Sequence, residues 1–253
     1  MGTLYAVGSR LFEAGFRAWN VDLRVSGVEN LPATGPAVVA SNHVSYLDFA
    51  FVMLAPPRPR REMRFLARSE FFENPVVGGL MRRLGQIPVD VHGDPVAAAA
   101  AAREALARGE MIGVHPEGTI SPSYTIRRAK SGAVRLAEDV GAPIIPTAIW
   151  GSQRLLTKWR PVRPPRRGIA VSVHYGEAFE PQGRTGMART RSLMDRIGAL
   201  LADVQAAYPQ QPAPGDDWWL PRHLGGGALD PQEAERRLDE QAARRRAEHD
   251  APR

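Results

Sequence analysis

The chain has 253 residues, no cysteine, a net charge of +6 and a hydrophobic fraction of 43%. This length suits one large domain, or one domain with a tail, and it can bury a core without cross-links. The lack of cysteine excludes disulfides, thiolate metal sites and a cysteine nucleophile. The positive charge favours an anionic partner, which could be nucleic acid, anionic lipid or a phosphorylated substrate.

Residues 1–20 are expected to form an amphipathic helix. Large apolar side chains recur at helical spacing over 3–19, with Arg10, Glu13 and Arg17 between them. Two interpretations stay open: the helix packs on its own domain, or it lies in a membrane interface. The charges interrupt the apolar core that a signal peptide needs, and no run reaches the roughly 18 residues that cross a bilayer. We therefore expect a protein of the cytoplasm.

Strands and helices alternate between residues 21 and 208. Short apolar or alternating runs predict strands at 21–27, 38–40, 87–89, 111–114, 144–150 and 169–175. Helical patterns cover about 45–54, a helix from Pro75, and 95–109, 131–140 and 187–208. This alternation predicts an α/β domain over 21–208, with a largely parallel central sheet flanked by helices. An apolar face within 71–81 fits an acyl-chain tunnel, a membrane-facing patch or plain core.

Residues 209–253 read as a polar C-terminal tail. The stretch 209–229 is rich in proline and glycine and predicts a linker on the surface. Residues 230–248 predict a helix that starts after Asp230 and has Leu238 as its one large apolar residue. Such a helix is solvated, contacts a partner or frays.

A candidate general base follows the predicted strand 38–40. Residues 42–48 read Asn-His-Val-Ser-Tyr-Leu-Asp. If Ser45 is the N-cap, then His43 stands just before the helix and Asp48 lies in its first turn, where its carboxylate can orient the imidazole. An imidazole held in this way is a general base. In the simpler alternative, Ser45 and Asp48 only cap the helix and His43 is an ordinary loop residue.

A second polar segment, His115-Pro116-Glu117-Gly118-Thr119, follows the strand 111–114. In parallel sheets, ligands bind beyond the carboxyl ends of the strands, so both segments can face one crevice. The loop that follows carries Arg127, Arg128 and Lys130, a composition suited to closing over an anion. A surface turn at Gly118 is the alternative for this segment.

These segments resemble a known family. Residues 42–48 resemble the NHxSxxD signature of the glycerolipid acyltransferases of the 1-acylglycerol-3-phosphate acyltransferase type, and residues 115–119 resemble their (F)PEGT block. Residues 85–90 and 143–146 are similar to the second and fourth blocks. All four occur in family order, each at a strand end, so the resemblance favours the catalytic interpretation of His43 and Asp48.

The resemblance implies a glycerol-3-phosphate acyltransferase-like fold and a direct acyl transfer. His43, oriented by Asp48, would take the proton of an acceptor hydroxyl, which attacks the thioester of acyl-CoA or an acyl-carrier protein. With lysophosphatidic acid as acceptor the product is phosphatidic acid, in phospholipid biosynthesis. Backbone N–H groups near the helix mouth would stabilise the oxyanion. The resemblance implies no bound cofactor and no metal, a structural role at the site for Asn42 and Ser45, and acceptor binding by Glu117, Gly118, Thr119, Arg127, Arg128 and Lys130.

Two positions depart from the family pattern. Ile120 and Val91 stand where many members carry arginines that are linked to the acceptor phosphate. Without them a phosphate would lose charge-assisted hydrogen bonds. Either neighbouring residues such as Lys130, Arg127 and His92 supply that charge, or the acceptor is another lysophospholipid or a glycolipid.

Basic residues gather in an acid-free stretch near Trp150 and Trp159, and we expect this stretch to contact CoA or a membrane. A solvated loop is the alternative. A second arginine cluster lies at 58–68. Basic charge beside interfacial tryptophan suits an anionic membrane, so we expect a peripheral protein at the cytoplasmic face of the cell membrane. No motif that reads nucleic acid accompanies these residues. The proposed contacts are Arg154, Lys158, Arg160 and Arg163.

Two readings from other classes remain. A metal-dependent hydrolase could use oxygen and imidazole ligands, and a basic lipid-binding module would leave His43 without a catalytic role. Neither accounts for the four ordered blocks. The ligands available to the hydrolase are His43, Asp48, Asp90, His92 and Asp94.

Overall fold

The computed structural model describes residues 3–56, 61–90, 95–162 and 167–250. Val91, His92, Asp94 and Arg163 lie outside these ranges, so the predictions made for them stay predictions.

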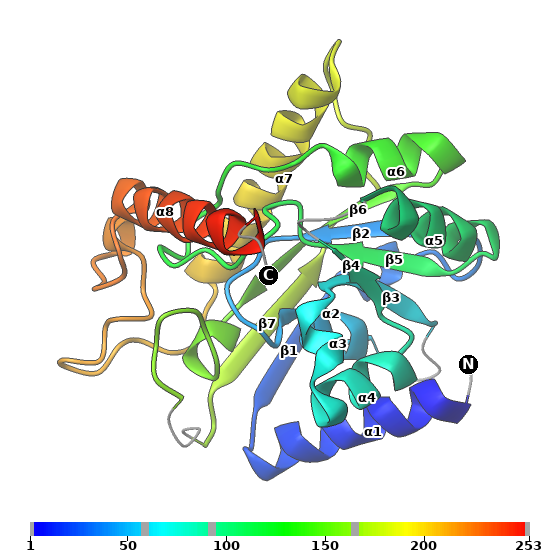
Figure 1. The fold of residues 1–253 in the computed structure, drawn as a ribbon. Helices are drawn as coiled ribbons and strands as arrows, with labels where there is room; N and C mark the ends of the chain where they lie inside the picture. The colour runs from blue at the N-terminus through cyan, green and yellow to red at the C-terminus, as the bar shows by residue number, and fades with distance from the viewer. Residues whose placement is uncertain (1–2, 57–60, 91–94, 163–166, 251–253) are drawn as a thin grey trace.

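A seven-stranded sheet forms the centre of the molecule (Figure 1). Its order is β1-β7-β6-β2-β5-β3-β4, and β6 with β7 is the antiparallel pair among otherwise parallel neighbours. The predicted α/β fold with a largely parallel sheet is therefore confirmed. The strands are β1 (Asp22–Ser26), β2 (Ala37–Ser41), β3 (Met63–Arg68), β4 (Ile87–Val89), β5 (Met111–Val114), β6 (Ile144–Trp150) and β7 (Ala170–Tyr175).

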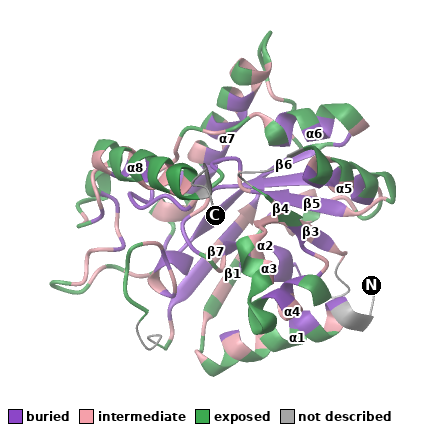
Figure 2. Ribbon diagram, viewed as in Figure 1, coloured by how far each residue is buried: buried purple, intermediate pink, exposed green. Residues whose placement is uncertain are grey.

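Helices cover both faces of the sheet (Figure 1). On one face lie α1 (Thr3–Ala18), α2 (Asp48–Leu54), α3 (Glu70–Glu73) and α4 (Pro75–Arg83). On the other lie α5 (Pro95–Ala107), α6 (Gly132–Val140) and α7 (Gly186–Ala206). Every residue of β2, β5 and β6 is buried between these layers, as strands covered on both faces require (Figure 2). Three short 3-10 helices span Val28–Asn30, Ser152–Arg154 and Arg222–Leu224.

Local sequence signals set several helix ends. The Asn74 side chain accepts hydrogen bonds from the N–H groups of Val76 and Val77, both at 3.0 Å, and caps α4 with proline at the first helical position. Helix α6 ends at Gly141, whose φ of +64° is a conformation that glycine adopts without strain. Both ends agree with the sequence prediction.

Strand β3 and helix α3 were not predicted from the sequence. The arginines around β3 hide its strand pattern, and their side chains turn out to be structural. Arg61 donates to the carbonyls of Pro32 and Gly109, and Arg64 pairs with Glu110. Within the arginine cluster noted at 58–68, these two side chains are therefore used inside the protein rather than left free for a ligand.

Helix α1 packs on its own domain. Phe16 stacks on Phe51 of α2 with ring centroids 4.1 Å apart, and Tyr5 is buried. Its outer face exposes Val7 and Leu11. No helix within the described ranges combines the length and apolar character needed to cross a bilayer.

The tail packs against the domain: most of the linker expected at 209–229 lies on the surface, but it buries one tryptophan. Trp219 is buried and its ring lies 5.8 Å from that of Tyr208. Helix α8 (Pro231–Asp250) buries Ala234 and Leu238 and leaves most of its other residues exposed (Figure 2). Helix α8 is therefore mostly solvated and contacts the domain along a narrow strip of its surface. In the sequence, Leu238 was the only sign of this contact.

Candidate active site

The polar segments gather at one edge of the sheet. Strands β3, β5, β2 and β6 are parallel neighbours, so their carboxyl ends lie side by side. His43 follows β2, His115 and Glu117 follow β5, and Ser152 follows β6. The expected crevice at the strand ends is therefore the place where these side chains meet.

His43 and Asp48 form a hydrogen-bonded pair. His43 Nδ1 lies 2.9 Å from Asp48 Oδ2, and the same oxygen accepts the N–H groups of Val44 at 2.7 Å and Ser45 at 2.8 Å. The hydroxyl of Ser152 donates to Asp48 Oδ1. The Asp48 side chain is fully buried, whereas that of His43 is 19% exposed. The carboxylate thus holds Nδ1 and leaves Nε2 to face a ligand.

The start of α2 differs from the prediction. The helix begins at Asp48, three residues later than expected, and Ser45 is not its N-cap. The Ser45 hydroxyl donates to the Leu156 carbonyl at 2.6 Å and accepts the Leu47 N–H at 3.1 Å. Because the Asp48 carboxylate captures the N–H groups of residues 44 and 45, residues 43–47 stay a loop.

The N–H groups of residues 43–47 are all bonded within the protein. Their acceptors are Glu117, Asp48, the Leu156 carbonyl and the Ser45 hydroxyl. The expectation that this stretch supplies an oxyanion hole is therefore wrong for residues 43–47, since its donors are already used to hold the loop.

Asn42 ties the ends of two strands together. Its side chain accepts the Ile149 N–H at 2.8 Å and donates to the Ile149 carbonyl at 3.0 Å. This pairing extends the contact between β2 and β6 and fixes where the loop to His43 begins. The structural role expected for Asn42 is consistent with these contacts.

Glu117 holds the backbone of His43. Its Oε1 accepts the His43 N–H at 3.0 Å, and the His43 carbonyl accepts the Ser121 N–H at 2.8 Å. Burial raises the pKa of Glu117 to about 8, against the opposing effects of the His43 N–H and the Arg127 charge. Glu117 is therefore mostly a neutral acid at pH 7, and its second oxygen is buried without a partner among the described residues.

His115 stacks on His43. The two rings lie 4.0 Å apart and are inclined by 2°, and the Phe65 ring is 5.1 Å from His115. His115 Nδ1 pairs with the Ser41 hydroxyl at 3.0 Å. Burial, and secondarily His43, lower the pKa of His115, so its ring is neutral at pH 7. Sequence reasoning gave His115 no role, although it stands where the family block has phenylalanine.

Of the residues expected to bind the acceptor, Glu117 contacts His43 directly, and the loop that follows it carries the others. Gly118 has a φ of +68°, and the Lys130 N–H donates to the Pro116 carbonyl at 2.9 Å. Lys158 Nζ donates to the Thr119 hydroxyl at 3.1 Å, so Lys158 lies beside the segment that follows β5 rather than on a separate surface. Ile120 is buried, and no charge replaces the arginine of the family at that position.

Arg127 and Arg128 reach the tail instead of an open crevice. Arg127 Nη2 lies 3.0 Å from Glu235 Oε2 in a two-point contact, and Arg128 pairs with Glu235 and Asp239. The Arg127 side chain is 6% exposed. Both arginines are therefore partly neutralised by carboxylates of α8.

The loop after β6 has a supporting role that sequence reasoning missed. The Thr157 hydroxyl donates to the Val44 carbonyl at 2.7 Å, and this loop also supplies Ser152 to Asp48. Arg154 bonds the Tyr208 hydroxyl at 3.1 Å and lies over the Trp219 ring, so it anchors the tail. Arg160 lies over Trp218. In the sequence, the position of Ser152 just after a buried strand was the signal that could have placed it at the site.

Within the described ranges, no group of three or more histidine, aspartate or glutamate side chains is arranged to hold a metal ion.

A model of the acyltransferase family matches residues 22–150, about half of the chain. The chain belongs to this acyltransferase family. The family resemblance inferred from the sequence blocks is thus confirmed.

Several proteins share this domain. An uncharacterized protein of Mycobacterium leprae is 34% identical over 152 residues, which cover 55% of this chain and 39% of that protein. The 1-acyl-sn-glycerol-3-phosphate acyltransferase of Bacillus subtilis is 28% identical over 130 residues, covering 51% of this chain and 63% of that enzyme. The chain therefore spans about two fifths to two thirds of these relatives.

A solved structure shows the same fold. The crystal structure of the 1-acyl-sn-glycerophosphate acyltransferase PlsC from Thermotoga maritima matches with a TM-score of 0.67 and 24% identity, over 81% of both chains.

Proposed function

We propose that the protein transfers a fatty acyl group from an acyl thioester to the free hydroxyl of lysophosphatidic acid, forming phosphatidic acid. The observation that carries this proposal is the His43–Asp48 pair, fixed at the carboxyl edge of the sheet, with Nε2 free of hydrogen bonds to the described residues. The named activities of the relatives from Bacillus subtilis and Thermotoga maritima support the choice of acceptor.

The geometry supports a direct transfer. With Nδ1–H donated to Asp48, His43 Nε2 accepts the proton of the acceptor hydroxyl as its oxygen attacks the thioester carbonyl. The tetrahedral intermediate collapses, the carbon–sulfur bond breaks, and the imidazolium returns a proton to the departing thiolate. A new ester and a free thiol result, and His43 regains its starting form. Since the chain has no cysteine, no thiol of the protein can carry the acyl group.

Another acceptor is the second candidate. Ile120 is buried and uncharged where many family members have an arginine, which weakens the argument for a phosphate at that place. A different lysophospholipid or a glycolipid hydroxyl would then be acylated by the same histidine. The donor is acyl-CoA or an acyl-carrier protein, and no bound cofactor is needed for the chemistry described.

We further propose that the protein works at an anionic membrane surface. Exposed apolar side chains continue from the loop beside His43 to α4, since Tyr46 lies 6.3 Å from Phe71 and α4 exposes Val76 and Val77. Leu11 extends this surface onto α1, which contacts α4. A lipid surface would cover these side chains and deliver an acceptor to the active site.

The membrane proposal has a matched test. The single variants Leu11→Asp and Val76→Asp should each bind less well to vesicles that contain anionic lipid. Met187→Asp is the control, because Met187 is 63% exposed on α7, which covers the other face of the sheet. Equal binding by all three variants and the wild type would contradict the proposed surface.

An assay with purified protein tests the proposed reaction. Acyl-CoA or an acyl-carrier protein is offered with lysophosphatidic acid, other lysophospholipids, monoacylglycerol and a glycolipid. The thiol released from CoA can be followed with a thiol reagent without background from the protein, because the chain has no cysteine. Transfer to lysophosphatidic acid that is lost in His43→Ala is expected. Transfer only to acceptors without phosphate would contradict the proposed acceptor.

A further inference from the structure

Helix α8 lies outside the segment that the family model matches and runs beside the active-site loops. Glu235 and Asp239 pair with the loop after β5. Ten residues farther along α8, about 15 Å, Arg245 reaches within 3.9 Å of Glu70 in α3. The helix therefore connects the ends of β5 and β3, and its position makes it a candidate wall of the site.

Three basic side chains from different elements come together under this helix. They are Arg68 at the end of β3, Lys158 in the loop after β6, and Arg245 of α8. Burial, together with the positive charges of Arg245, Arg68 and Arg127, lowers the pKa of Lys158 to about 8. Contacts join the three side chains: Arg68 and Arg245 share Glu70, and Lys158 lies beside Trp159, which lines a cavity together with Arg245.

The positive charges of Arg68, Lys158 and Arg245 are not balanced by the carboxylates that pair with them. Glu70 is its nearby carboxylate, at 3.8 Å from Arg68 and 3.9 Å from Arg245. Lys158 donates to the Thr119 hydroxyl and forms no salt bridge with the described carboxylates. Arg68 Nε and Arg127 Nη1 are buried without a hydrogen-bond partner in the part of the chain that the structure describes. Buried donors of this kind are costly unless a ligand accepts from them.

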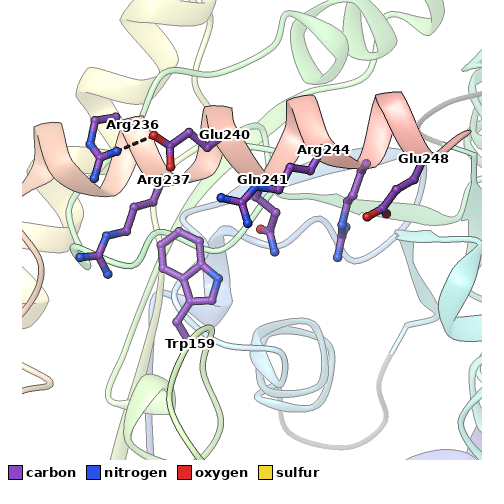
Figure 3. Close-up of a pocket in the computed structure, with 8 residues that line it drawn as sticks. Trp159, Arg236, Arg237, Glu240, Gln241, Arg244 and Glu248 are labelled. Carbon is purple, nitrogen blue, oxygen red and sulfur yellow. Dashed lines mark hydrogen bonds and ion pairs between the residues drawn. The ribbon is translucent and has the colours of Figure 1, made fainter. Parts of the chain in front are cut away.

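A cavity adjoins the cluster. It has a volume of about 490 Å³ and lies between α8 and Trp159, and Arg245 is the member of the cluster that lines it. Four arginines of α8 (Arg236, Arg237, Arg244 and Arg245) outnumber the two carboxylates in the lining, Glu240 and Glu248. Figure 3 shows Trp159 facing the side of α8 from which Arg237, Gln241 and Arg244 project. Lys158 lies 5.3 Å from the Trp159 ring. An anion bound by Arg245 at the edge of this cavity would be reached from solvent, and Lys158 links this place to Thr119 through a hydrogen bond.

We propose that Lys158, Arg245 and Arg68 bind a phosphate group, and that α8 completes this site. Phosphate supplies the acceptor oxygens that the cluster lacks, and guanidinium forks bind it at two points. The phosphate belongs either to the lipid acceptor or to CoA, and that choice rests on the proposed function. For an acceptor, the cluster would replace the charge missing at Ile120.

A binding measurement tests the site without catalysis. The wild type, Arg245→Gln, Lys158→Met and the conservative Lys158→Arg are titrated with glycerol 3-phosphate and inorganic pyrophosphate by calorimetry. Arg246→Gln is the matched control, since Arg246 is an exposed neighbour in α8 that does not line the cavity. We expect Arg245→Gln and Lys158→Met to weaken binding by about 10- to 100-fold. Lys158→Arg and Arg246→Gln should stay within about threefold.

The proton balance of binding adds an independent readout. An anion beside Lys158 favours its protonated form, so binding at pH 9 should take up protons in the wild type. This uptake should vanish in Lys158→Met. No binding of either phosphate probe by the wild type, or equal binding by all variants, would overturn the proposed site.

Kinetics separates the two sources of the phosphate. If Arg245→Gln and Lys158→Met raise the KM for lysophosphatidic acid but not for monoacylglycerol, the site binds the acceptor. A higher KM for acyl-CoA but not for an acyl-pantetheine thioester would assign it to CoA. A loss of kcat with every substrate and no change in any KM would overturn the proposal. If the wild type binds phosphate but transfers no acyl group, the proposed function fails and the site stands.

Discussion

The His43–Asp48 centre and the basic cluster under α8 lie at the same edge of the sheet but differ in how their polar groups are satisfied. Asp48 accepts from an imidazole, two backbone N–H groups and a hydroxyl, all within the protein. In the basic cluster, the buried Nε of Arg68 has no partner among the described residues, and neither has Nη1 of the neighbouring Arg127. The first region is already organised for proton transfer, whereas the second is completed by a ligand.

Because the His43–Asp48 centre is already organised, we expect substitutions there to have the largest effect on kcat. His43→Ala should lower kcat by about 10³-fold or more, and Asp48→Asn by about 10²- to 10⁴-fold, because the base or its orientation is lost. Circular dichroism should show that the fold persists. His223→Ala, at an exposed histidine, is the control. Activity of His43→Ala within tenfold of the wild type would contradict the role of His43.

The link between the two regions is the contact of Arg127 with α8. Glu235→Gln should leave the nearly buried Arg127 without a counter-charge, lowering the free energy of unfolding by about 1–3 kcal/mol. Amide hydrogen exchange of residues 231–250 should rise. Glu240→Gln is matched, since Glu240 pairs with Arg236 inside the exposed helix. That change should cost at most about 0.5 kcal/mol. Similar values for both variants would remove the argument that α8 is anchored at Arg127.

The buried acid beside His43 predicts a pH dependence of stability. With a folded pKa of about 8 against an ordinary value of 4.5, Glu117 keeps a proton that the unfolded chain releases. Stability should therefore fall as pH rises between about 4.5 and 8, by an amount on the order of 5 kcal/mol over the window. Urea unfolding of the wild type and Glu117→Gln measures this. The glutamine variant should lose most of that slope; parallel curves would show that Glu117 is not buried as a neutral acid.

The stacked pair of histidines predicts the smallest change. His115→Phe restores the residue of the family block and keeps an aromatic face against His43, so kcat should change by less than about threefold. The lost bond to Ser41 is offset because the unpartnered Nε2 is removed as well. His115→Ala removes the ring and should cost more. A large loss in His115→Phe would mean that the neutral imidazole itself takes part in the reaction.

Much of the site could be predicted because its signals are local. Asn42 to Asp48 lie within seven residues, and a buried strand before them fixes which edge of the sheet they reach. Glu117 to Thr119 follow another such strand, so the pattern of buried runs was enough to bring both segments together. The exact start of α2 was missed because the Asp48 carboxylate bonds backwards to Val44 and Ser45 and delays the helix.

The sequence by itself determined the α/β class, the order of most strands and helices, and the position of His43 and Asp48 at one strand end, since each depends on spacing along the chain. Tertiary structure alone decided the partners of the basic residues. Arg127 meets Glu235 across 108 residues, and Lys158 meets Thr119 across 39. Contacts at such separations leave no periodic trace in the sequence, because they arise only when the sheet and the tail bring distant segments to one edge.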